Sequence, residues 1–371
     1  MRRILHVVGA RPNFMKIAPV MEALAKRSGV AQCLVHTGQH YDARMSGVFF
    51  EQLGLPRPDR DLEVGSGTQA EQTAAVMVEF EKTLGEERPD VVVVVGDVNS
   101  TLAATLVAAK AGVPVAHVEA GLRSFDLSMP EEINRMVTDR LARVLLTPSR
   151  DADENLRKEG VDEARIHFVG NVMIDTLLRH RPRAPWKEVS GRLSLKERAY
   201  SVLTLHRPAN VDAPEALARI LSRIEPVAAE YPVVFPVHPR TARSMRESGL
   251  EASRSMRVVE PLGYLEFLAL LDHAALVLTD SGGIQEETTV LGVPCFTLRD
   301  NTERPVTITQ GTNTLVGADA GGLDRAFRDL RESGGRTARI PELWDGRTGE
   351  RIAEVLADSA AGRPFAPRGS G

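Results

Sequence analysis

Residues 91–97 read Val-Val-Val-Val-Val-Gly-Asp, a run of five β-branched residues that ends in a glycine and an acid. A continuous apolar run, with no alternation of polar residues, is typical of a β-strand that is covered on both faces. A Ser-, Thr- and Ala-rich segment follows and ends at Gly112-Val113-Pro114, where glycine and proline form a helix stop signal. The next apolar run is Val115–Val118. A strand, a helix and a strand in this order predict a parallel α/β sheet.

The same unit occurs again in the second half of the chain. The apolar run Leu276–Thr279 is followed by Asp280-Ser281, a second predicted helix and then Gly292-Val293-Pro294. This repetition predicts two similar Rossmann-like halves, with the hinge between them near Gly170-Asn171. Ligands of such sheets bind beyond the carboxyl ends of the strands, so we expect the ligand between the two halves.

Further strands are expected wherever a short β-branched run is bounded by Gly, Pro or Asp. Together with the runs already named, these are Ile4–Val8, Gln32–His36, Val144–Thr147, Ile166–Val169, Ser201–Leu205, Val233–Val237 and Cys295–Leu298. Amphipathic helices are expected between them. The first has Ile17, Val20, Met21 and Leu24 on one face and ends at Gly29.

Length, charge and cysteine content narrow the class of protein. A chain of 371 residues predicts two domains, and a net charge of −4 argues against a nucleic-acid partner. Cys33 and Cys295 form neither a disulfide framework nor a zinc motif, so we expect no metal site and a cytoplasmic location. The longest apolar stretch, Phe267–Leu278, contains Asp272 and His273 and is shorter than the roughly 20 residues of a membrane span. We therefore expect no membrane segment.

A first group of candidate residues follows the first predicted strand. Arg11 and Lys16 flank the start of a helix, where positive charge and free N–H groups favour an anion. The segment Gly9–Lys16 lacks the glycine spacing of a dinucleotide fingerprint, so no nicotinamide site is expected there. A pair of solvated surface cations is the alternative interpretation.

A second group is acidic. Asp97 and Glu119 each end an apolar strand, and neighbouring parallel strands would bring both carboxylates to one edge of a sheet. Crowded carboxylates raise one another's pKa, which suits proton transfer. Glu131 and Glu132 follow Pro130, a pattern that is also typical of an ordinary helix start. We favour a functional role for the first two acids and a structural role for Glu132.

A third group lies in the second half. The glycines of Ser281-Gly282-Gly283 let the backbone approach a ligand closely, and their N–H groups suit a diphosphate. Glu287, one helical turn along, suits ribose hydroxyls. A glycine-rich turn with an N-cap serine is the alternative. Arg304 and His206 add candidate charge in this half, although a packed histidine competes with a functional His206.

Taken together, the motifs have a specific order along the chain. They are Gly9-Ala10-Arg11-Pro12, Thr37-Gly38-Gln39-His40, Gly96-Asp97, His117-Val118-Glu119-Ala120-Gly121-Leu122-Arg123, Pro130-Glu131-Glu132, His206-Arg207, Pro236-Val237-His238, Asp280 to Glu287, and Thr302-Glu303-Arg304-Pro305. From about residue 4 to about residue 357 the chain resembles the non-hydrolysing UDP-N-acetylglucosamine 2-epimerases.

The resemblance implies the GT-B fold, which is an α/β architecture of two Rossmann-like domains facing a central cleft. The N-terminal domain would span residues 1–170, with a C-terminal helix at about 348–362 crossing back to it. The UDP-binding domain would span 171–347. Members of the family are usually homodimers, so a homodimer is expected here.

The resemblance also implies a reaction. UDP leaves carbon 1 of UDP-N-acetylglucosamine (UDP-GlcNAc) while a base removes the proton on carbon 2, which gives bound 2-acetamidoglucal. UDP then adds back, and a proton on the opposite face yields UDP-N-acetylmannosamine (UDP-ManNAc). No cofactor is implied. The implied catalytic set is Asp97, Glu119, Glu131 and His206. The implied substrate-binding set is Arg11, Lys16, Leu262, Phe267, Ser281, Gly282, Gly283, Glu287 and Arg304.

Three further residues match a regulatory site of relatives that UDP-GlcNAc activates. They are Gln39, His40 and His238. The loop that carries an Arg-Gln pair in those relatives reads Val64-Gly65-Ser66-Gly67 here, which predicts weak or absent activation by substrate. A second departure is Ala209, where the family often has Glu beside the histidine that corresponds to His206.

Four other functions compete with this one. A hydrolysing epimerase would release UDP and free ManNAc, and a sister enzyme would act on a UDP-diacetamido-uronic acid. A GT-B glycosyltransferase would share the diphosphate cradle but needs an acceptor site, and the clustered acids argue against it. A sugar-nucleotide-binding regulator without activity is disfavoured by the same acids.

Overall fold

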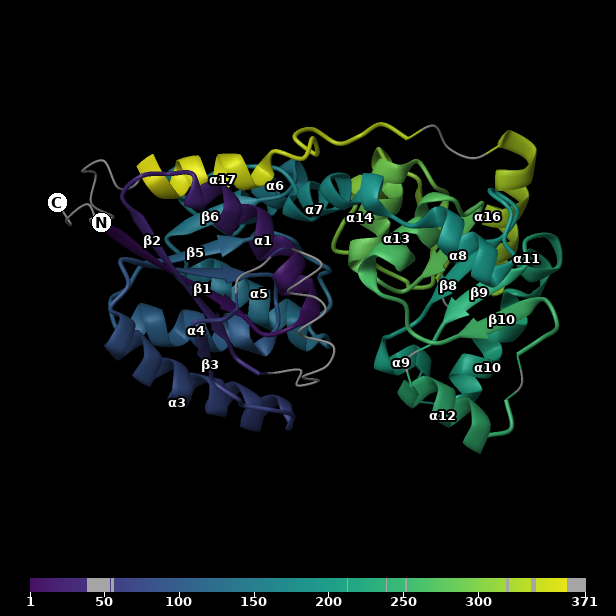
Figure 1. Ribbon diagram of the computed structural model, residues 1–371, viewed down its shortest axis with the longest axis horizontal. Helices are drawn as coiled ribbons and strands as arrows, with labels where there is room; N and C mark the ends of the chain where they lie inside the picture. Colours follow the sequence, from purple (N-terminus) through teal and green to yellow (C-terminus); the bar gives the residue numbers. More distant parts are fainter. Residues whose placement is uncertain are drawn as a thin grey trace. The chain divides into compact units, whose positions relative to one another are not determined.

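The chain forms two compact units in a computed structural model, which describes residues 1–38, 54, 57–211, 213–237, 239–250, 252–317, 320–334 and 338–358. Unit 1 contains Met1–Thr176 and the C-terminal residues from Glu342, and unit 2 contains Leu177–Pro341. Each unit is a parallel sheet with its own helices (Figure 1), as the alternation of strands and helices predicts.

The sheet of unit 1 has the strand order β3-β2-β1-β4-β5-β6-β7, and every pairing is parallel. The strands are β1 (Arg2–Val8), β2 (Val30–His36), β3 (Arg60–Asp61), β4 (Val91–Val95), β5 (Val115–Val118), β6 (Val144–Thr147) and β7 (Ile166–Phe168). The helices are α1 (Arg11–Ala25), α3 (Gln69–Glu87), α4 (Asn99–Lys110), α5 (Pro130–Leu141), α6 (Arg150–Lys158) and α17 (Thr348–Asp358), with a 3₁₀ turn at Glu163–Arg165.

One part of the core of unit 1 lies between the sheet and the helices α3 and α4. Leu5, Val92 and Val94 of adjacent strands are fully buried against Phe80 of α3 and Ala104 of α4. Figure 1 shows α1 and α17 along one face of the sheet and α3 and α4 along the other. The register places Val94 of β4 beside His117 of β5, so the residues that follow these two strands share one edge.

The C-terminal segment is held on unit 1 at the start of α17. Asp175 accepts hydrogen bonds from the backbone N–H groups of Thr348 (3.0 Å) and Gly349 (2.7 Å). A Cβ added to Gly349 would lie 2.6 Å from the Pro19 carbonyl oxygen, so glycine permits this close approach to α1. The sequence places a helix at about 348–362. In the structure α17 spans Thr348–Asp358, and the residues after 358 lie outside the described part of the chain.

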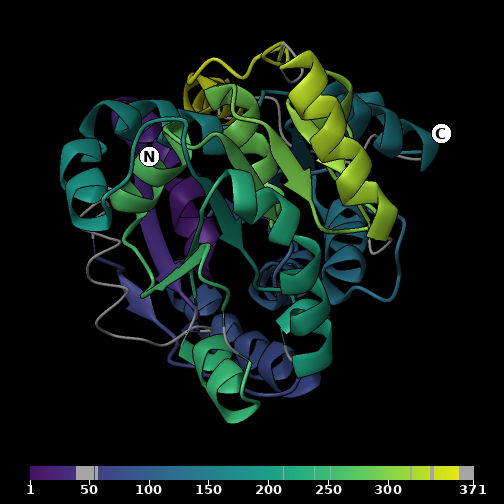
Figure 2. The same cartoon turned by 90° about the vertical axis from the view of Figure 1, so that its right-hand side faces the viewer.

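The sheet of unit 2 has the strand order β10-β9-β8-β11-β12-β13 and is also parallel. The strands are β8 (Ser201–Thr204), β9 (Val233–Pro236), β10 (Met256–Val259), β11 (Leu276–Thr279), β12 (Cys295–Thr297) and β13 (Asn313–Leu315). Helices lie on both faces of this sheet (Figure 2).

The helix α7 (Val172–His180) begins in unit 1 and ends in unit 2. The further helices of unit 2 are α8 (Trp186–Leu193), α9 (Pro208–Val211), α10 (Pro214–Arg223), α11 (Glu225–Glu230), α12 (Pro239–Glu247), α13 (Tyr264–Asp272), α14 (Gly282–Leu291), α15 (Val306–Thr309) and α16 (Ala320–Ser333). A 3₁₀ turn occupies Arg181–Arg183. Across the described part of the chain, no helix combines the length and the apolar character that crossing a membrane would require.

Candidate active site

Asn13 joins the carboxyl ends of two strands in unit 1. Its Oδ1 accepts hydrogen bonds from the N–H groups of Gly9 (3.2 Å) and Ala10 (2.9 Å), which follow β1. Its Nδ2 donates to the carbonyl oxygen of Val95 (2.9 Å), the last residue of β4. A Cβ added to Gly9 would lie 2.3 Å from Ser100 Oγ, so the loop packs this tightly only with glycine.

Glu119 follows β5 directly and is buried. Its φ angle of 74° lies in the left-handed region, which is uncommon for a residue other than glycine. The Glu119 carboxylate forms an ion pair with Lys16 of α1. A Cβ added to Gly96 would lie 3.5 Å from Glu119 Oε2 and 3.5 Å from Lys16 Nζ. The structure therefore brings Lys16 and Glu119 together beside the residue that precedes Asp97.

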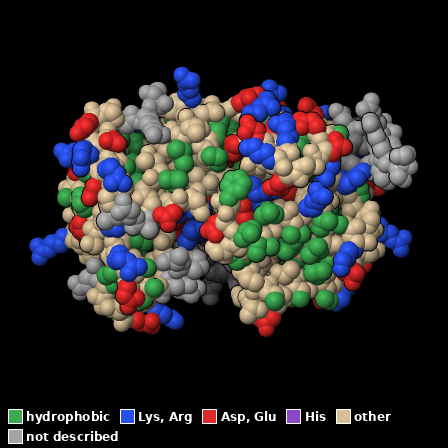
Figure 3. Space-filling model, turned by 180° about the vertical axis from the view of Figure 1, so that it is seen from behind, with side chains coloured by type: hydrophobic (Ala, Val, Ile, Leu, Met, Phe, Trp, Pro, Cys, Tyr) green, Lys and Arg blue, Asp and Glu red, His purple; other side chains and the backbone are tan. Residues whose placement is uncertain are grey.

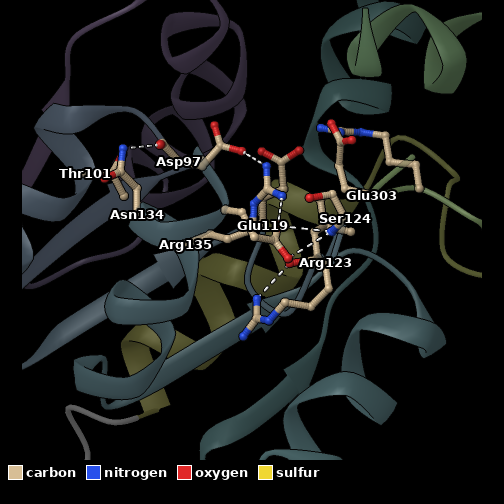
Figure 4. Close-up of polar contacts among 12 residues, drawn as sticks. Asp97, Thr101, Glu119, Arg123, Ser124, Asn134, Arg135 and Glu303 are labelled. Carbon is tan, nitrogen blue, oxygen red and sulfur yellow. Dashed lines mark hydrogen bonds and ion pairs between the residues drawn. The ribbon is translucent and has the colours of Figure 1, made fainter. Parts of the chain in front are cut away.

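Asp97 follows β4, and its side chain is 29% exposed. Its carboxylate forms an ion pair with Arg135 of α5, and its carbonyl oxygen accepts from Asn134 Nδ2 at 2.9 Å (Figure 4). The sequence pattern led us to expect that Asp97 and Glu119 would crowd each other. Each carboxylate contacts a cation, because Arg135 and Lys16 reach the strand ends from two different helices.

The neighbouring acids Glu131 and Glu132 have different surroundings on the first turn of α5. Glu132 is fully buried, accepts from the backbone N–H groups of Ser124 and Phe125, and forms an ion pair with Arg135. It thereby holds the loop after β5. Glu131 is exposed.

Four predicted positions are not described at the level of side chains. Arg11 begins α1, but its side chain lies outside what the structure describes. Gln39, His40 and His238 lie wholly outside the described residues.

In unit 2, His206 follows β8 and forms a pair with Asp280, which follows β11. The Asp280 carboxylate is fully buried and contacts His206 Nδ1 at 2.6 Å. It also accepts from the N–H groups of His206 and Arg207 and from Asn210 Nδ2 (2.9 Å). Burial raises the pKa of Asp280, but the hydrogen bonds and the charge of His206 outweigh it, and the net pKa lies below its usual value.

The His206 side chain is 60% exposed despite this contact. An aspartate on Nδ1 fixes the orientation and the tautomer of the imidazole, and Nε2 is then available for proton exchange. This arrangement suits a general acid or base.

The predicted phosphate cradle lies at the start of α14. Ser281 occupies the N-cap position but makes no side-chain capping bond, and Gly282 and Gly283 begin the helix. A Cβ added to Gly282 would lie 2.4 Å from Arg304 Nη1, so the Arg304 guanidinium packs on the glycine backbone. The structure thus brings Arg304 to a helix N-terminus, where N–H groups and cations favour an anion.

Two carboxylates accompany Arg304. Its Nε donates to Glu286 Oε1 at 2.7 Å, and its Nη1 forms an ion pair with Glu303. Arg299 contacts the other oxygen of Glu303 at 2.8 Å. These contacts fix the position of a buried guanidinium that would otherwise be costly to desolvate.

The positions predicted for the nucleoside lie on α13 and α14. Glu287 is buried and accepts a hydrogen bond from the Tyr264 hydroxyl at 3.3 Å. Burial raises the pKa of Glu287 to about 7, although the Tyr264 hydrogen bond lowers it. Phe267 lies on α13 and Leu262 just before it, and both are partly buried.

Sequence reasoning assigned no role to three residues that organise these edges, namely Asn13, Arg135 and Asp280. Asp280 had a usable signal, because it ends an apolar strand as Asp97 does. Arg135 and Asn13 had none, since both lie inside helical segments whose pattern does not indicate a partner. In the part of the chain that the structure describes, no group of three or more His, Cys, Asp or Glu residues is arranged to hold a metal ion.

Comparison with known proteins gives consistent matches over nearly the whole chain. The family model described as UDP-N-acetylglucosamine 2-epimerase matches residues 22–357. The UDP-N-acetylglucosamine 2-epimerase of Methanocaldococcus jannaschii is 44% identical over 359 residues, which covers 94% of this chain and 97% of that protein. A UDP-2,3-diacetamido-2,3-dideoxy-D-glucuronate 2-epimerase of Pseudomonas aeruginosa is 42% identical and covers 96% of this chain and 99% of its own.

Solved structures agree with the fold. The crystal structure of the M. jannaschii UDP-GlcNAc 2-epimerase in complex with UDP-GlcNAc and UDP matches with a TM-score of 0.89 and 42% identity, covering 96% of this chain and 99% of that chain. The Neisseria meningitidis UDP-GlcNAc 2-epimerase bound to UDP-GlcNAc matches with a TM-score of 0.87 and 30% identity, covering 96% of this chain and 100% of that chain. The predicted α/β fold with two Rossmann-like domains of the GT-B type is confirmed.

Proposed function

Because the chain belongs to the UDP-N-acetylglucosamine 2-epimerase family, we propose that it interconverts UDP-GlcNAc and UDP-ManNAc. The reaction is an elimination of UDP that gives enzyme-bound 2-acetamidoglucal, followed by re-addition of UDP. The observation that carries this proposal is the pair of strand-end acids in unit 1, Asp97 and Glu119, each beside a cation. Such groups suit the removal and return of the proton on carbon 2.

The departing UDP needs stabilisation, because the proton on carbon 2 is not acidic. We assign the diphosphate to the N–H groups of Ser281, Gly282 and Gly283 together with Arg304, which packs on Gly282. We also assign Arg11 and Lys16 to the diphosphate, as two further cations. Glu287 would accept from the ribose, and Leu262 and Phe267 would border the uracil.

The acid–base set of the proposal is Asp97, Glu119, Glu131 and His206. Epimerisation requires proton traffic on both faces of carbon 2, so more than one group has to exchange protons. The exposed ring of His206, oriented by Asp280, supports its membership of this set. Carboxyl and imidazole groups exchange their protons with solvent, so the proton returned to carbon 2 would come from solvent. The proposed elimination and re-addition transfers a proton and no hydride, so it would need neither NAD nor a metal ion.

The domain organisation and the site of action belong to the same proposal. We assign residues 1–170 with the C-terminal helix to the first domain, and 171–347 to the UDP-binding domain. The free and buried thiols of Cys33 and Cys295 support a cytoplasmic location. The regulatory assignment of Gln39, His40 and His238 stays a prediction from the sequence, as does weak activation by substrate.

We also propose a homodimer. Unit 1 has a face with gathered apolar side chains (Figure 3), and its exposed large apolar residues include Val78, Phe125, Leu127, Ile133, Met136 and Leu141. An apolar face of this kind on a folded protein marks an interaction surface. Sedimentation analysis of the wild-type chain and of the Ile133→Glu variant tests this assignment, because a dimer formed through this face would dissociate in the variant.

The function is tested by incubation with UDP-GlcNAc in heavy water, followed by identification of the product. We expect UDP-ManNAc that carries deuterium at carbon 2, with no effect of a chelator and no need for added NAD. Release of UDP and free ManNAc would instead identify a hydrolysing enzyme. Turnover only of a UDP-diacetamido-uronic acid would identify the sister activity. A product that keeps its original hydrogen at carbon 2 would rule out the proton mechanism.

A further inference from the structure

The segment that carries Glu119 is anchored on one buried side chain, Asp139 of α5. Its Oδ1 contacts His117 Nδ1 at 2.6 Å, and its Oδ2 accepts from the Gly121 N–H at 3.1 Å. His117 is in β5, and Gly121 lies after that strand. Glu119 is midway between them, so both ends of its short segment are anchored on the two oxygens of one carboxylate.

The backbone between His117 and Gly121 has an unfavourable conformation that its contacts must stabilise. Glu119 has a φ angle of 74° and Gly121 one of 82°. A left-handed conformation at a residue with a side chain is unfavourable and persists only where the surroundings impose it. The N–H of Glu119 also donates to the Leu146 carbonyl oxygen at 3.0 Å. A Cβ added to Gly121 would lie 2.5 Å from the Ala152 carbonyl oxygen, so the turn has little room to relax.

The second ring nitrogen of His117 binds the turn that carries Asp97. His117 Nε2 donates to the carbonyl oxygen of Gly96 at 2.8 Å, and Gly96 is followed by Asp97. Gly96 also has a left-handed φ angle, 68°, and donates its N–H to Val118 at 3.1 Å. One side chain of β5 therefore fixes the turn that presents the acid of β4.

The charge of Asp139 is balanced from the opposite side. Arg123 Nη1 donates to Asp139 Oδ2 at 2.7 Å, and the rest of this guanidinium forms two 2.7 Å bonds with Glu159. His117, Asp139 and Arg123 are all buried. Burial raises the pKa of Asp139, but the ion pairs and hydrogen bonds with His117 and Arg123 outweigh this effect, and the net pKa lies below its usual value. The group is therefore a carboxylate that can accept hydrogen bonds from all its donors. A buried carboxylate in which each oxygen is engaged is a rigid anchor.

We propose that Asp139 and His117 are positioning residues for the proposed epimerisation. Through their hydrogen bonds to the backbone next to Glu119 and Asp97, they hold these two acids in the positions that the reaction requires. This inference rests on the proposed function. Neither residue is placed to touch the substrate, since both side chains are fully enclosed. Loss of either one should therefore affect the reacting step rather than substrate binding, because a misplacement of about 1 Å costs about 10²-fold in rate.

The test measures kcat and KM for conversion of UDP-GlcNAc to UDP-ManNAc in Asp139→Asn, His117→Gln and His117→Leu. We expect Asp139→Asn to lower kcat by about 10- to 100-fold with little change in KM. The His117 variants form a matched pair, since the glutamine amide can still donate to Gly96 and leucine cannot. His117→Gln should keep more of the kcat than His117→Leu.

Two controls separate positioning from general destabilisation. Asp153→Asn alters another buried carboxylate of unit 1, which accepts from the Thr147 hydroxyl, and Glu159→Gln alters only the outer end of the network. Both should lower the melting temperature and leave kcat unchanged. A fall in stability without a fall in kcat in Asp139→Asn and His117→Leu would overturn the inference. If Asp139→Asn does not fold, the two His117 variants decide it. An inactive wild-type enzyme would refute the proposed function first.

Discussion

The two units each pair a histidine with a buried aspartate near the carboxyl ends of their strands, yet the two histidines have opposite surroundings. In unit 1 the His117 ring is fully buried, and Asp139 and the Gly96 carbonyl occupy both of its nitrogens. In unit 2 the aspartate is buried but 60% of the His206 side chain is exposed. Within the described residues, the contact with Asp280 is the one hydrogen bond or ion pair of the His206 ring.

This difference shows that a histidine–aspartate contact does not by itself indicate proton transfer. A ring whose nitrogens are both engaged supports its surroundings, whereas a ring with one engaged and one accessible nitrogen can exchange a proton. By this criterion, the proposed proton transfer would depend on the acids Asp97 and Glu119 in unit 1 and on His206 in unit 2.

The largest effect should come from removing the acids of unit 1. We expect Asp97→Asn and Glu119→Gln each to lose about 10²–10⁴ in turnover, the usual contribution of a general acid–base group. UDP binding, measured by calorimetry, should remain. Glu79→Gln is the control, because Glu79 is an exposed acid of α3 that contacts Lys82. Near-native rates in both site variants would remove unit 1 from the proton transfer.

A second prediction tests whether Asp280 affects turnover by orienting the His206 ring. Asp280→Asn keeps the shape of the side chain but replaces one acceptor oxygen with a donor, so the ring is no longer held in one tautomer. We expect kcat to fall by about 10²-fold. Because the two residues act as a unit, Asp280→Asn should cause little further loss in a His206→Gln background. Independent, multiplicative losses in the double variant would separate the two residues.

A third prediction concerns one proposed phosphate-binding cation in each unit, Lys16 in unit 1 and Arg304 in unit 2. Arg304→Ala and Lys16→Ala should each weaken UDP binding by about tenfold, because a hydrogen bond between charged groups is typically worth about 1.5–3 kcal/mol. The deficit should be larger at low salt, where charges are less screened. Arg331→Ala, which removes an exposed cation of α16, serves as the control for calorimetry. Unchanged affinity in both site variants would place the diphosphate elsewhere.

The central strands of each sheet could be predicted from the sequence, but several of the edge strands could not. The continuous valine run of residues 91–95 is buried at every position, and it is a strand as expected. The strands β3, β10 and β13 were missed. They lie at the edges of the sheets, have two to four residues each, and expose part of their side chains, so their sequences lack the apolar run that marks a covered strand.

The same distinction applies to the candidate site. Asp97 and Glu119 could be selected because each follows an apolar run, which is a local signal. Their partners could not, since Lys16 is 103 residues from Glu119 and Arg135 is 38 residues from Asp97. The order of strands brings these pairs together, and it depends on crossovers that no local pattern specifies. The expectation that the two acids crowd each other stays a prediction.

The last prediction concerns stability, not activity, and a buried carboxyl group of unit 2. Glu287 is enclosed between α13 and α14, with the Tyr264 hydroxyl as its hydrogen-bond donor. Burial raises its pKa to about 7, above the ordinary value of 4.5. Between about pH 4.5 and pH 7 the folded state therefore holds a proton that the unfolded state has released. Stability should fall as the pH rises through this range, because the native state is the one that binds more protons.

Glu287→Gln isolates this contribution, because glutamine keeps an oxygen that can accept from Tyr264 but does not titrate. The free energy of unfolding of the variant minus that of the wild type should increase from about pH 4.5 to about pH 7 and level off beyond. The increase has an upper bound of a few kcal/mol, since each pKa unit corresponds to about 1.4 kcal/mol. Urea unfolding without UDP across this pH range measures it, and Glu79→Gln should show no such rise. A difference that does not depend on pH would mean that Glu287 is ionised in the folded protein throughout this range.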